Sequence, residues 1–533
     1  MSVQQDVADL VASAAAERPD AIAVVEASGR HLTWGGLEDQ VARVASGLGA
    51  AGVVAGQRVM VVLGNRLEFV TTYLGVLRAQ AVAVPVNPGS TAGELARMLA
   101  DSGTRLVVGE PDTLPAVREA VATVDRLRSG DPGDLDPTLR ERAAPVRVVA
   151  VGGEAQGTEL SYDDLVAVEP RAVPPLRDPE KLAALLYTSG TSGVPRAAML
   201  THRALLANVE QVAAVEPPMM HGDDVVLGVL PLFHVYGLNA VLGGVLRHRA
   251  RLVLAERFDP DATLDLIEDE ACSVLPVAPA VFGHWLREEQ LRERLGPVRL
   301  VLSGSAPLAA ESARAFTEAT GLPVHQGYGL TEAAPVVTST LCSAELHDGS
   351  VGAALPGIEL RLVDDRGEPP VGEDPGEIEV RGANLFSGYW PDGQDGPDAE
   401  GWWATGDVGF LDPSGDLYLV DRLKELVIVS GFNVYPVEVE DVVREVEGVA
   451  EVAVIGVADE DTGEAVVAYV RATGRDPADV EAAVREHCAG RLARFKQPTR
   501  VEVVDELPLT VTGKVQKGRL RGLERRRALG LLE

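Results

Sequence analysis

The segment LLYTSGTSGVPRAAMLTH, residues Leu185–His202, joins an apolar run to a loop of glycine and hydroxyl residues. The run is typical of a buried strand. The loop contains Thr188, Ser189, Gly190, Thr191, Ser192 and Gly193. Glycines let backbone amides converge on a phosphate, and hydroxyls add donors, so the segment predicts a phosphate-binding loop. It is not of the Walker type, because no Gly-Lys-Ser/Thr closes it. Taken alone, such a loop is also compatible with a plain turn.

On both sides of this loop, short apolar runs alternate with segments of helical spacing. RVMVVLG, AVAVPV and TRLVVGE precede it, whereas ARLVLAE, CSVLPVAP and VRLVLSGS follow it. The alternation is typical of parallel strands with crossover helices, and it predicts two α/β sheets. Residues 112–179 are rich in charge, Pro and Gly, and we expect an irregular connection with surface helices there.

The pattern changes twice in the last third of the chain. Short strands separated by turns between residues 352 and 420 predict a small antiparallel barrel or sheet. After residue 421 helices and strands alternate in a compact α+β pattern. The expected fold class is α/β, with a large N-terminal domain of two α/β sheets plus a small β-barrel over residues 1–420. A small, mobile α+β C-terminal domain is expected over residues 421–533.

Composition limits the class of protein. The chain has 533 residues, 46% of them hydrophobic, which is ample for more than one large core and excludes intrinsic disorder. The formal net charge of -32 opposes binding to nucleic acid. Any anionic ligand therefore needs a local site.

One stretch has the length of a membrane span. Residues 225–246 contain no Asp, Glu, Lys or Arg, but Pro231, several glycines and His234 interrupt them. We therefore expect buried structure lining a pocket and no integral membrane segment. The amino terminus shows no secretion signal, and three scattered cysteines match no metal spacing, so a cytoplasmic protein is expected.

Seven motifs resemble, in order, the signatures of the adenylate-forming superfamily of acyl-CoA synthetases, luciferases and peptide-synthetase adenylation domains. Besides the phosphate loop they are PLFHVYG (231–237), SGSAPL (303–308), QGYGLTEAAPV (326–336), TGDVG (405–409), DRLKELVIVSGFNVYP (421–436) and PLTVTGKVQK (508–517). They span nearly the whole chain. The resemblance implies that a carboxylic acid and ATP form an acyl-adenylate, after which the thiol of CoA displaces AMP. ATP, Mg²⁺ and CoA are the cofactors that it implies.

The resemblance assigns a nucleotide site. Tyr328 is expected to pack on adenine, Thr331 to contact the α-phosphate, and Asp407 with Arg422 to bind the ribose. Glu332, together with Thr188, is expected at Mg²⁺, a hard cation that prefers carboxylate, water and phosphate oxygens. The full set of residues expected at ATP and AMP is Thr188, Ser189, Gly190, Thr191, Ser192, Gly193, Arg196, Gly304, Gln326, Gly327, Tyr328, Gly329, Thr331, Asp407 and Arg422.

Two of the motifs contain a basic residue, Arg196 and Lys514, that is expected near the phosphates. The family's usual Pro-Lys-Gly is Pro195, Arg196 and Ala197 here, and arginine keeps the positive charge near the departing pyrophosphate. Because arginine replaces lysine widely in this chain, Arg196→Lys is expected to be nearly silent. Lys514 is one of only five lysines among 48 basic residues. By resemblance it reaches the substrate carboxylate and the α-phosphate, and it is expected to be catalytic together with His234 and Glu332.

The acyl site is expected around His234, which by resemblance is a gate beside the carboxyl carbon. Its walls, Val235, Tyr236, Gly304, Gly329, Pro335 and Val336, are apolar or small. No aspartate in PLFHVYGLN meets an α-ammonium, so an amino acid would leave its charge unpaired. A medium- or long-chain fatty acid is the first expectation, and an aryl or phenylpropanoid acid is the second.

The acceptor is indicated by SGFNVYP. Ser430, Gly431 and Phe432 resemble the passage for the pantetheine arm of CoA, and an acyl carrier protein with the same arm is the alternative acceptor. Lys424 resembles the hinge about which the small domain turns between half-reactions. A non-catalytic nucleotide- or acyl-binding relative is the alternative from another class, and the sequence indicates no oligomeric state.

Overall fold

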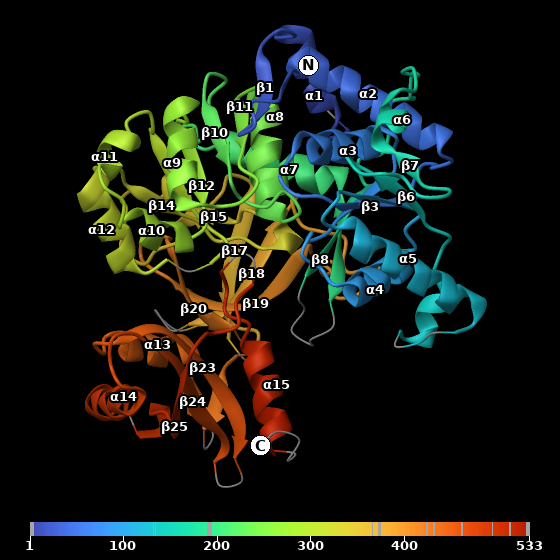
Figure 1. Cartoon of the computed structure of the whole chain (residues 1–533). Coiled ribbons are helices and arrows are strands. Elements are labelled where there is room, and N and C mark those ends of the chain that lie inside the picture. Colours follow the sequence, from blue (N-terminus) through green and yellow to red (C-terminus); the bar gives the residue numbers. More distant parts are fainter. Residues whose placement is uncertain are drawn as a thin grey trace.

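A computed structural model describes residues 5–131, 133, 135–188, 195–306, 308–364, 366–370, 375–422, 425–429, 432–459, 462–492, 494–510 and 513–528. It shows a large part built on two seven-stranded sheets and a smaller part at the carboxyl end. In Figure 1 the smaller part lies below the larger one, and strands β19 and β20 lie where the two parts meet.

The first sheet has the strand order β7-β6-β5-β3-β4-β8-β9 and is parallel except for β9. Its strands are β3 (Arg58–Val62), β4 (Val82–Pro85), β5 (Leu106–Gly109), β6 (Arg147–Ala150), β7 (Leu160–Ser161), β8 (Leu182–Thr188) and β9 (Arg196–Thr201). The helices along this stretch are α2 (Trp34–Ala50), α3 (Leu67–Arg78), α4 (Ala92–Ser102), α5 (Leu114–Ser129), η1 (Pro137–Glu141) and α6 (Tyr162–Val166). Residues 112–179 are thus more regular than expected, because β6 and β7 extend one edge of the sheet.

The second sheet has the order β14-β13-β12-β10-β11-β1-β2 and is parallel except for β2. Its strands are β1 (Ile22–Glu26), β2 (His31–Thr33), β10 (Val225–Gly228), β11 (Arg251–Leu254), β12 (Val274–Val277), β13 (Leu300–Ser303) and β14 (Val324–Gln326). The helices are α1 (Asp9–Glu17), α7 (His202–Ala213), α8 (Gly244–His248), α9 (Pro260–Asp269), α10 (Ala280–Trp285), α11 (Leu291–Arg294) and α12 (Ala310–Thr320). The two predicted α/β sheets are therefore confirmed.

The uncharged stretch 225–246 folds as β10, a loop, the π-helix η2 (Tyr236–Gly243) and the start of α8. Its leucines and valines, apart from the half-buried Val225, lie in the core, as the interruptions by proline and glycine predicted. Among the described residues, no helix has both the length and the apolar character that a membrane crossing requires.

The remaining strands form three smaller sheets. Two-residue strands β15 (Thr338–Ser339) and β16 (Ala353–Ala354) pair with each other, and β17 (Ile358–Val363), β18 (Gly376–Gly382), β19 (Trp402–Leu411) and β20 (Leu417–Arg422) form a curled antiparallel sheet. The carboxyl-terminal sheet contains β21 (Val427–Val429), β22 (Phe432–Val434), β23 (Val449–Asp459), β24 (Gly463–Ala472) and β25 (Arg500–Val504). Helices α13 (Pro436–Arg444), α14 (Pro477–Arg491) and α15 (Lys517–Ala528) accompany it, which confirms the expected α+β unit. Short turns η3 (Thr331–Ala333), η4 (Thr340–Cys342) and η5 (Arg494–Lys496) complete the described elements.

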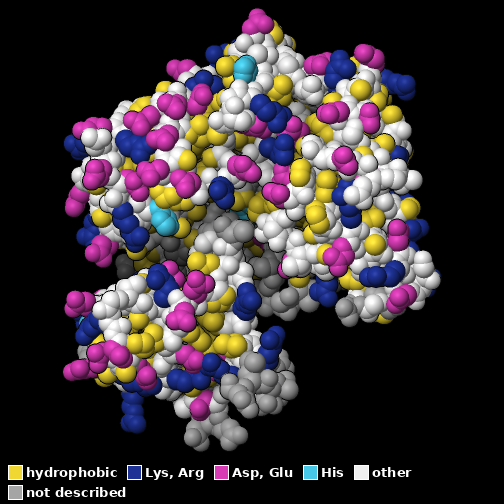
Figure 2. Space-filling view, viewed as in Figure 1, with side chains coloured by type: hydrophobic (Ala, Val, Ile, Leu, Met, Phe, Trp, Pro, Cys, Tyr) yellow, Lys and Arg dark blue, Asp and Glu magenta, His cyan; other side chains and the backbone are white. Residues whose placement is uncertain are grey.

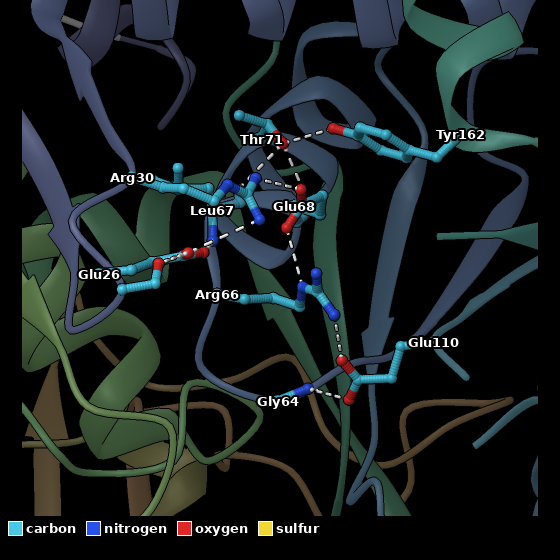
Figure 3. Close-up of polar contacts among 10 residues, drawn as sticks. Glu26, Arg30, Gly64, Arg66, Leu67, Glu68, Thr71, Glu110 and Tyr162 are labelled. Atoms are coloured by element: carbon cyan, nitrogen blue, oxygen red, sulfur yellow. Dashed lines mark hydrogen bonds and ion pairs between the residues drawn. The ribbon is translucent and has the colours of Figure 1, made fainter. Parts of the chain in front are cut away.

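A polar seam joins the two large sheets (Figure 3). Glu26, at the end of β1, accepts from the backbone of Leu67 at 2.8 Å, where α3 begins. Arg30 donates to Glu68 in the first turn of α3, and Arg66 donates to Glu68 at 2.8 Å and to Glu110 at 2.7 Å. Carboxylates at a helix amino terminus are stabilised by its dipole, and each pair here is also hydrogen-bonded. The seam therefore fixes the amino end of α3 between the sheets.

The visible surface carries charges of both signs in close mixture (Figure 2). Many arginines on the described surface pair with carboxylates, as Arg381 does with Glu359 and Arg118 with Glu159. An acidic net charge of -32 thus coexists with many local ion pairs. It does not produce one uniform acidic face in this view.

Candidate active site

The candidate site lies where parallel strands end. Thr188 closes β8, Ser303 closes β13 and Gln326 closes β14, and Ser303 is the register partner of Gln326. Ligands of open α/β sheets bind at the carboxyl ends of strands, so these positions suit a nucleotide site. Of the predicted residues, Ser189, Gly190, Thr191, Ser192, Gly193, Lys424, Ser430 and Gly431 lie outside the described residues. The backbones of Arg422 and Phe432 are described, but their side chains are not.

Tyr328 and Asp407 come together from distant segments. The Tyr328 hydroxyl donates to Asp407 Oδ2 at 2.6 Å, and the two residues are 7% and 8% exposed. Asp407 lies on β19, where its backbone N–H donates to Thr405 Oγ1 and its register partner on β20 is Arg422. A carboxylate has acceptor sites for several donors, so this one suits the vicinal hydroxyls of a ribose. The structure thus brings together residues that the motifs placed at adenine and ribose.

Glu332 is a buried carboxylate in η3, only 8% exposed. Its Oε1 accepts from the Tyr389 hydroxyl at 2.6 Å. Burial, reinforced by the Glu332 charge, raises the pKa of Tyr389 well above its usual value, so the phenol stays protonated and donates. Sequence reasoning missed Tyr389, which lies in FSGYWPDGQD; the cluster of aromatics among turn residues was the available signal.

Arg196 begins β9, directly after the phosphate loop. Its guanidinium lies over the Tyr389 ring, 3.9 Å from the centroid, and pairs with Asp395 at 2.8 Å. Its carbonyl accepts from the Thr188 hydroxyl at 3.4 Å, across the β8–β9 pair. The phosphate-loop cation therefore lies on the same tyrosine that contacts Glu332.

The donor set fits Mg²⁺ carried by ATP. The part of the chain that the structure describes contains no group of three or more His, Cys, Asp or Glu side chains able to hold a metal ion. Mg²⁺ commonly uses one or two carboxylates together with water and substrate phosphates, so it needs no complete protein cage. Glu332 with the Thr188 hydroxyl suits that mode of binding, in which the phosphates would supply further ligands.

His234 and Lys514 face the same region. Burial, together with the smaller effect of the positive charge of Lys514, lowers the pKa of His234 to about 4, so the imidazole is neutral at pH 7. Lys514 lies in a turn whose backbone is held by Thr510, and the neighbouring Gly513 approaches Ala280 of α10. The carboxyl-terminal unit thus presents Lys514 to the large domain beside the expected acyl gate.

The predicted acyl residues form close backbone contacts. A Cβ added at Gly304 would lie 2.8 Å from Tyr236 Cε1, so the Tyr236 ring packs on a bare backbone. A Cβ at Gly329 would lie 2.5 Å from the Pro335 carbonyl oxygen. Gly329 also pairs with Val336 in an isolated antiparallel bridge. These glycines let the QGYGLTEAAPV segment fold back on itself, and Tyr236 narrows the space beside Gly304.

Buried asparagines that sequence reasoning missed support these loops. Asn65 donates to the carbonyls of Gly228 and Leu230 and accepts from the backbone of Leu232, at 2.9–3.0 Å. These bonds fix the chain immediately before His234. Further buried amides hold the 333–336 backbone, namely Asn208 on Val336, Asn239 on Ala334 and Asn384 on Ala333. The signal for Asn239 was an amide within an otherwise apolar stretch.

Comparisons with known proteins agree with this arrangement. The AMP-binding enzyme model matches residues 11–390, and the AMP-binding enzyme C-terminal domain model matches residues 438–514. The chain is 34% identical to 4-coumarate–CoA ligase 5 of Oryza sativa subsp. japonica, covering 96% of this chain and 93% of the relative. It is 32% identical to the long-chain-fatty-acid–CoA ligase of Bacillus subtilis (strain 168), with the same coverage.

Two solved structures of one protein, MatB, differ in how closely their shape matches that of this chain. ATP-bound MatB from Rhodopseudomonas palustris superposes with a TM-score of 0.85 at 33% identity, covering 97% of this chain and 99% of that one. Apo MatB has the same identity and coverage but a TM-score of 0.73. Since sequence identity does not differ, the present structure lies nearer in shape to the ATP-bound form. Motifs, fold and family models together show that the chain belongs to the AMP-binding enzymes, the adenylate-forming superfamily.

Proposed function

We propose that this protein is an ATP-dependent acyl-CoA synthetase. The observation that carries the proposal is that Lys514 of the carboxyl-terminal unit lies near His234 of the large domain. The large domain also supplies Glu332, Tyr328 and Asp407. A lysine ammonium between the two parts of the molecule suits a reaction in which negative charge gathers on a phosphate. The 4-coumarate–CoA and long-chain-fatty-acid–CoA ligases among its relatives support the same class of reaction.

In the first half-reaction a carboxylate oxygen attacks the α-phosphorus of ATP. The bond from this phosphorus to the bridging oxygen breaks, and pyrophosphate leaves with Arg196 nearby. Lys514 attracts the carboxylate and stabilises the negative charge that gathers on the α-phosphate, whereas Tyr328, Asp407 and Arg422 hold the nucleoside. Neutral His234 lets a carboxylate approach without forming a fixed ion pair there.

In the second half-reaction the thiol sulfur of CoA attacks the acyl carbonyl carbon. The bond from that carbon to the phosphate oxygen breaks, AMP leaves, and the thiol proton passes to solvent. We assign the pantetheine passage to Ser430, Gly431 and Phe432. Free CoA is the proposed acceptor, and a carrier protein with the same arm is the alternative.

The proposed substrate is a medium- or long-chain fatty acid, because the residues expected at the gate are apolar or small and the segment PLFHVYGLN contains no carboxylate to pair with an ammonium. An aryl or phenylpropanoid acid is a second candidate. It is favoured by the Tyr236 ring on Gly304, which narrows the pocket, and by the 34% identity to a 4-coumarate–CoA ligase. The free state of Cys272, Cys342 and Cys488 suits the cytoplasm that we propose as its location.

The test is ATP–pyrophosphate exchange with a panel of acids, followed by mass spectrometry of products formed with CoA and with a phosphopantetheinylated carrier protein. Fatty acids should support exchange and give acyl-CoA. Exchange with cinnamate-type acids alone would transfer the assignment to aryl acids. Nucleotide binding without exchange for any acid would overturn the enzymatic assignment and support a binding protein.

A further inference from the structure

The segment that carries Tyr389 is joined to the strand after the phosphate loop. Trp390 N–H donates to the Ala197 carbonyl at 2.9 Å. Ser387 N–H donates to the Met199 carbonyl at 3.0 Å, and Met199 N–H donates to the Gly388 carbonyl at 3.1 Å. On its other side, Phe386 N–H donates to the Glu332 carbonyl at 2.9 Å. Residues 386–390 therefore lie between the phosphate-loop strand and η3, and they touch both.

Tyr389 contacts a functional group with each part of its side chain. Its hydroxyl donates to Glu332 Oε1, and its ring face carries the guanidinium of Arg196. The Phe386 ring packs edge-on against Tyr389 at 5.0 Å between centroids, which limits the rotation of the phenol. Arg196 is 37% exposed and Asp395 is 68% exposed, so the ion pair between them is weak by itself. The ring contact is therefore the stronger constraint on Arg196.

We propose that Tyr389 is a positioning residue that orients two groups of the ATP site at once, the Glu332 carboxylate through its hydroxyl and the Arg196 guanidinium through its ring. This inference rests on the proposed function, because it assigns both groups to Mg²⁺–ATP. A planar guanidinium stacks on an aromatic face and keeps its N–H donors free at the edge, which a lysine ammonium does not reproduce. On this proposal, arginine at position 196 is required for stacking on Tyr389, and lysine does not replace it without loss.

The hydroxyl contact is tested with Tyr389→Phe, which keeps the ring. Calorimetry with Mg²⁺–ATP should show affinity about tenfold weaker, as expected for losing a hydrogen bond to a charged group. AMP affinity without Mg²⁺ should stay within about twofold, because the ribose contacts at Asp407 are untouched. Tyr418→Phe, on a ring stacked with Phe410 of β19, is the matched control and should change neither affinity.

The ring contact is tested with Arg196→Lys in three backgrounds. In the wild type it should weaken Mg²⁺–ATP binding about threefold, and the same loss should persist with Tyr389→Phe, where the ring remains. With Tyr389→Met the loss should disappear, because no ring is left to stack on. Arg361→Lys is the matched control, since Arg361 lies 4.1 Å from the Trp402 ring and pairs with Glu379 away from the site.

Two results would overturn the inference. One is Mg²⁺–ATP affinity within about twofold of the wild type for Tyr389→Phe, and the other is an equal cost of Arg196→Lys with and without the ring. Thermal unfolding checks each variant, and Tyr389→Leu replaces Tyr389→Met if the latter unfolds at the assay temperature. Failure of the proposed function would appear in a different measurement, as the absence of acid-dependent ATP–pyrophosphate exchange in the wild type. The role of Tyr389 is tested by nucleotide binding, which does not depend on that exchange.

Discussion

At the scale of single residues, the surroundings of each ionisable group decide its charge state in the candidate site. His234 is kept neutral mainly by burial and then by the charge of Lys514, whereas Lys514 is exposed on its turn. A neutral imidazole and a charged ammonium can share one anionic substrate without competing for it. We therefore propose that Lys514 stabilises charge on the substrate, whereas His234 shapes the acyl site and controls access to it.

Lys514→Ala should stop adenylation and spare thioester formation from supplied acyl-adenylate. The charge of Lys514 is needed where a carboxylate attacks phosphorus, so its removal should slow exchange by about a hundredfold or more. Exchange and thioester formation are measured separately. Lys496→Ala is the control, because Lys496 pairs with Glu438 within the carboxyl-terminal unit. Equal losses in both half-reactions would contradict this role.

Asn65→Ala should disturb the acid site more than the nucleotide site. The change leaves the carbonyls of Gly228 and Leu230 and the N–H of Leu232 without their amide partner, at about 1–3 kcal/mol for each buried group left unsatisfied. We expect a lower unfolding temperature and a higher KM for the acid, with ATP affinity nearly unchanged. Asn87→Ala, at a turn where Asn87 accepts from Gly89 at 2.9 Å, is the control. A larger effect on ATP than on the acid would contradict the assignment.

At the scale of elements, sequence periodicity predicted the strongly apolar strands and missed short ones. RVMVVLG and VRLVLSGS are buried in parallel sheets, and they fold as β3 and β13 close to the expected bounds. Strand β6 has four residues, RVVA, within a charged and proline-rich region, too short for periodicity to separate from a loop. Its pairing with β5 depends on residues far along the chain, which no local window contains.

In the candidate site, too, the sequence does not reveal residues whose contacts lie far away in the chain. Motifs located Tyr328, Glu332 and Asp407, because residues with chemical roles stand in recognisable local patterns. Tyr389 and Asn65 act through other residues, and the partners of their side-chain hydrogen bonds lie 57 to 167 positions away in the chain. The stacking of Arg196 on Tyr389 is invisible without the fold, so the sequence alone gives no reason to distinguish arginine from lysine at this position.

The seam at the start of α3 provides a prediction with a pH dependence. Burial by itself raises the pKa of Glu68, but hydrogen bonds from Arg30 and Arg66 outweigh it and hold the pKa below its usual value. A lowered pKa in the folded state adds stability above the unfolded pKa of about 4.3, and this is lost as pH falls through the folded pKa. Glu68→Gln should therefore destabilise the protein at pH 7 by about 1–3 kcal/mol.

Urea unfolding of the wild type and Glu68→Gln measures this effect. The difference between the two proteins should be constant from pH 7 to about 5 and should shrink below about pH 4. Glu359→Gln is the control, because its pair with Arg381 lies on the exposed face of β17 and should contribute little. A difference that grows on acidification would have the wrong sign for a lowered pKa.

At the scale of the whole molecule, the carboxyl-terminal unit has one position here but two tasks in the proposed reaction. Its turn at Lys514 faces His234, and the structure superposes better on ATP-bound than on apo MatB. Lys517, three residues beyond Lys514, pairs with Glu425 at 3.2 Å and Glu440 at 2.8 Å. The turn, α15, α13 and the start of the unit are thereby tied together. The whole unit must move if Lys514 is to withdraw from the acyl group.

Movement of that unit has to be absorbed between β20 and β21, where the large domain ends and the carboxyl-terminal sheet begins. Lys424 stands in this connection, next to Glu425, and a hinge is a position whose φ and ψ change. Proline locks φ near about -65° and removes a backbone donor, so Lys424→Pro should hold the unit in one orientation. Because Lys514 lies near His234, the proposed acyl gate, in the present arrangement, we expect ATP–pyrophosphate exchange to survive and CoA transfer to fail. This is the opposite of the pattern for Lys514→Ala. Lys424→Ala is the control: it removes the charge but leaves φ free, and it should support both half-reactions. Normal CoA transfer by Lys424→Pro would show that the hinge lies elsewhere or that no rotation is required.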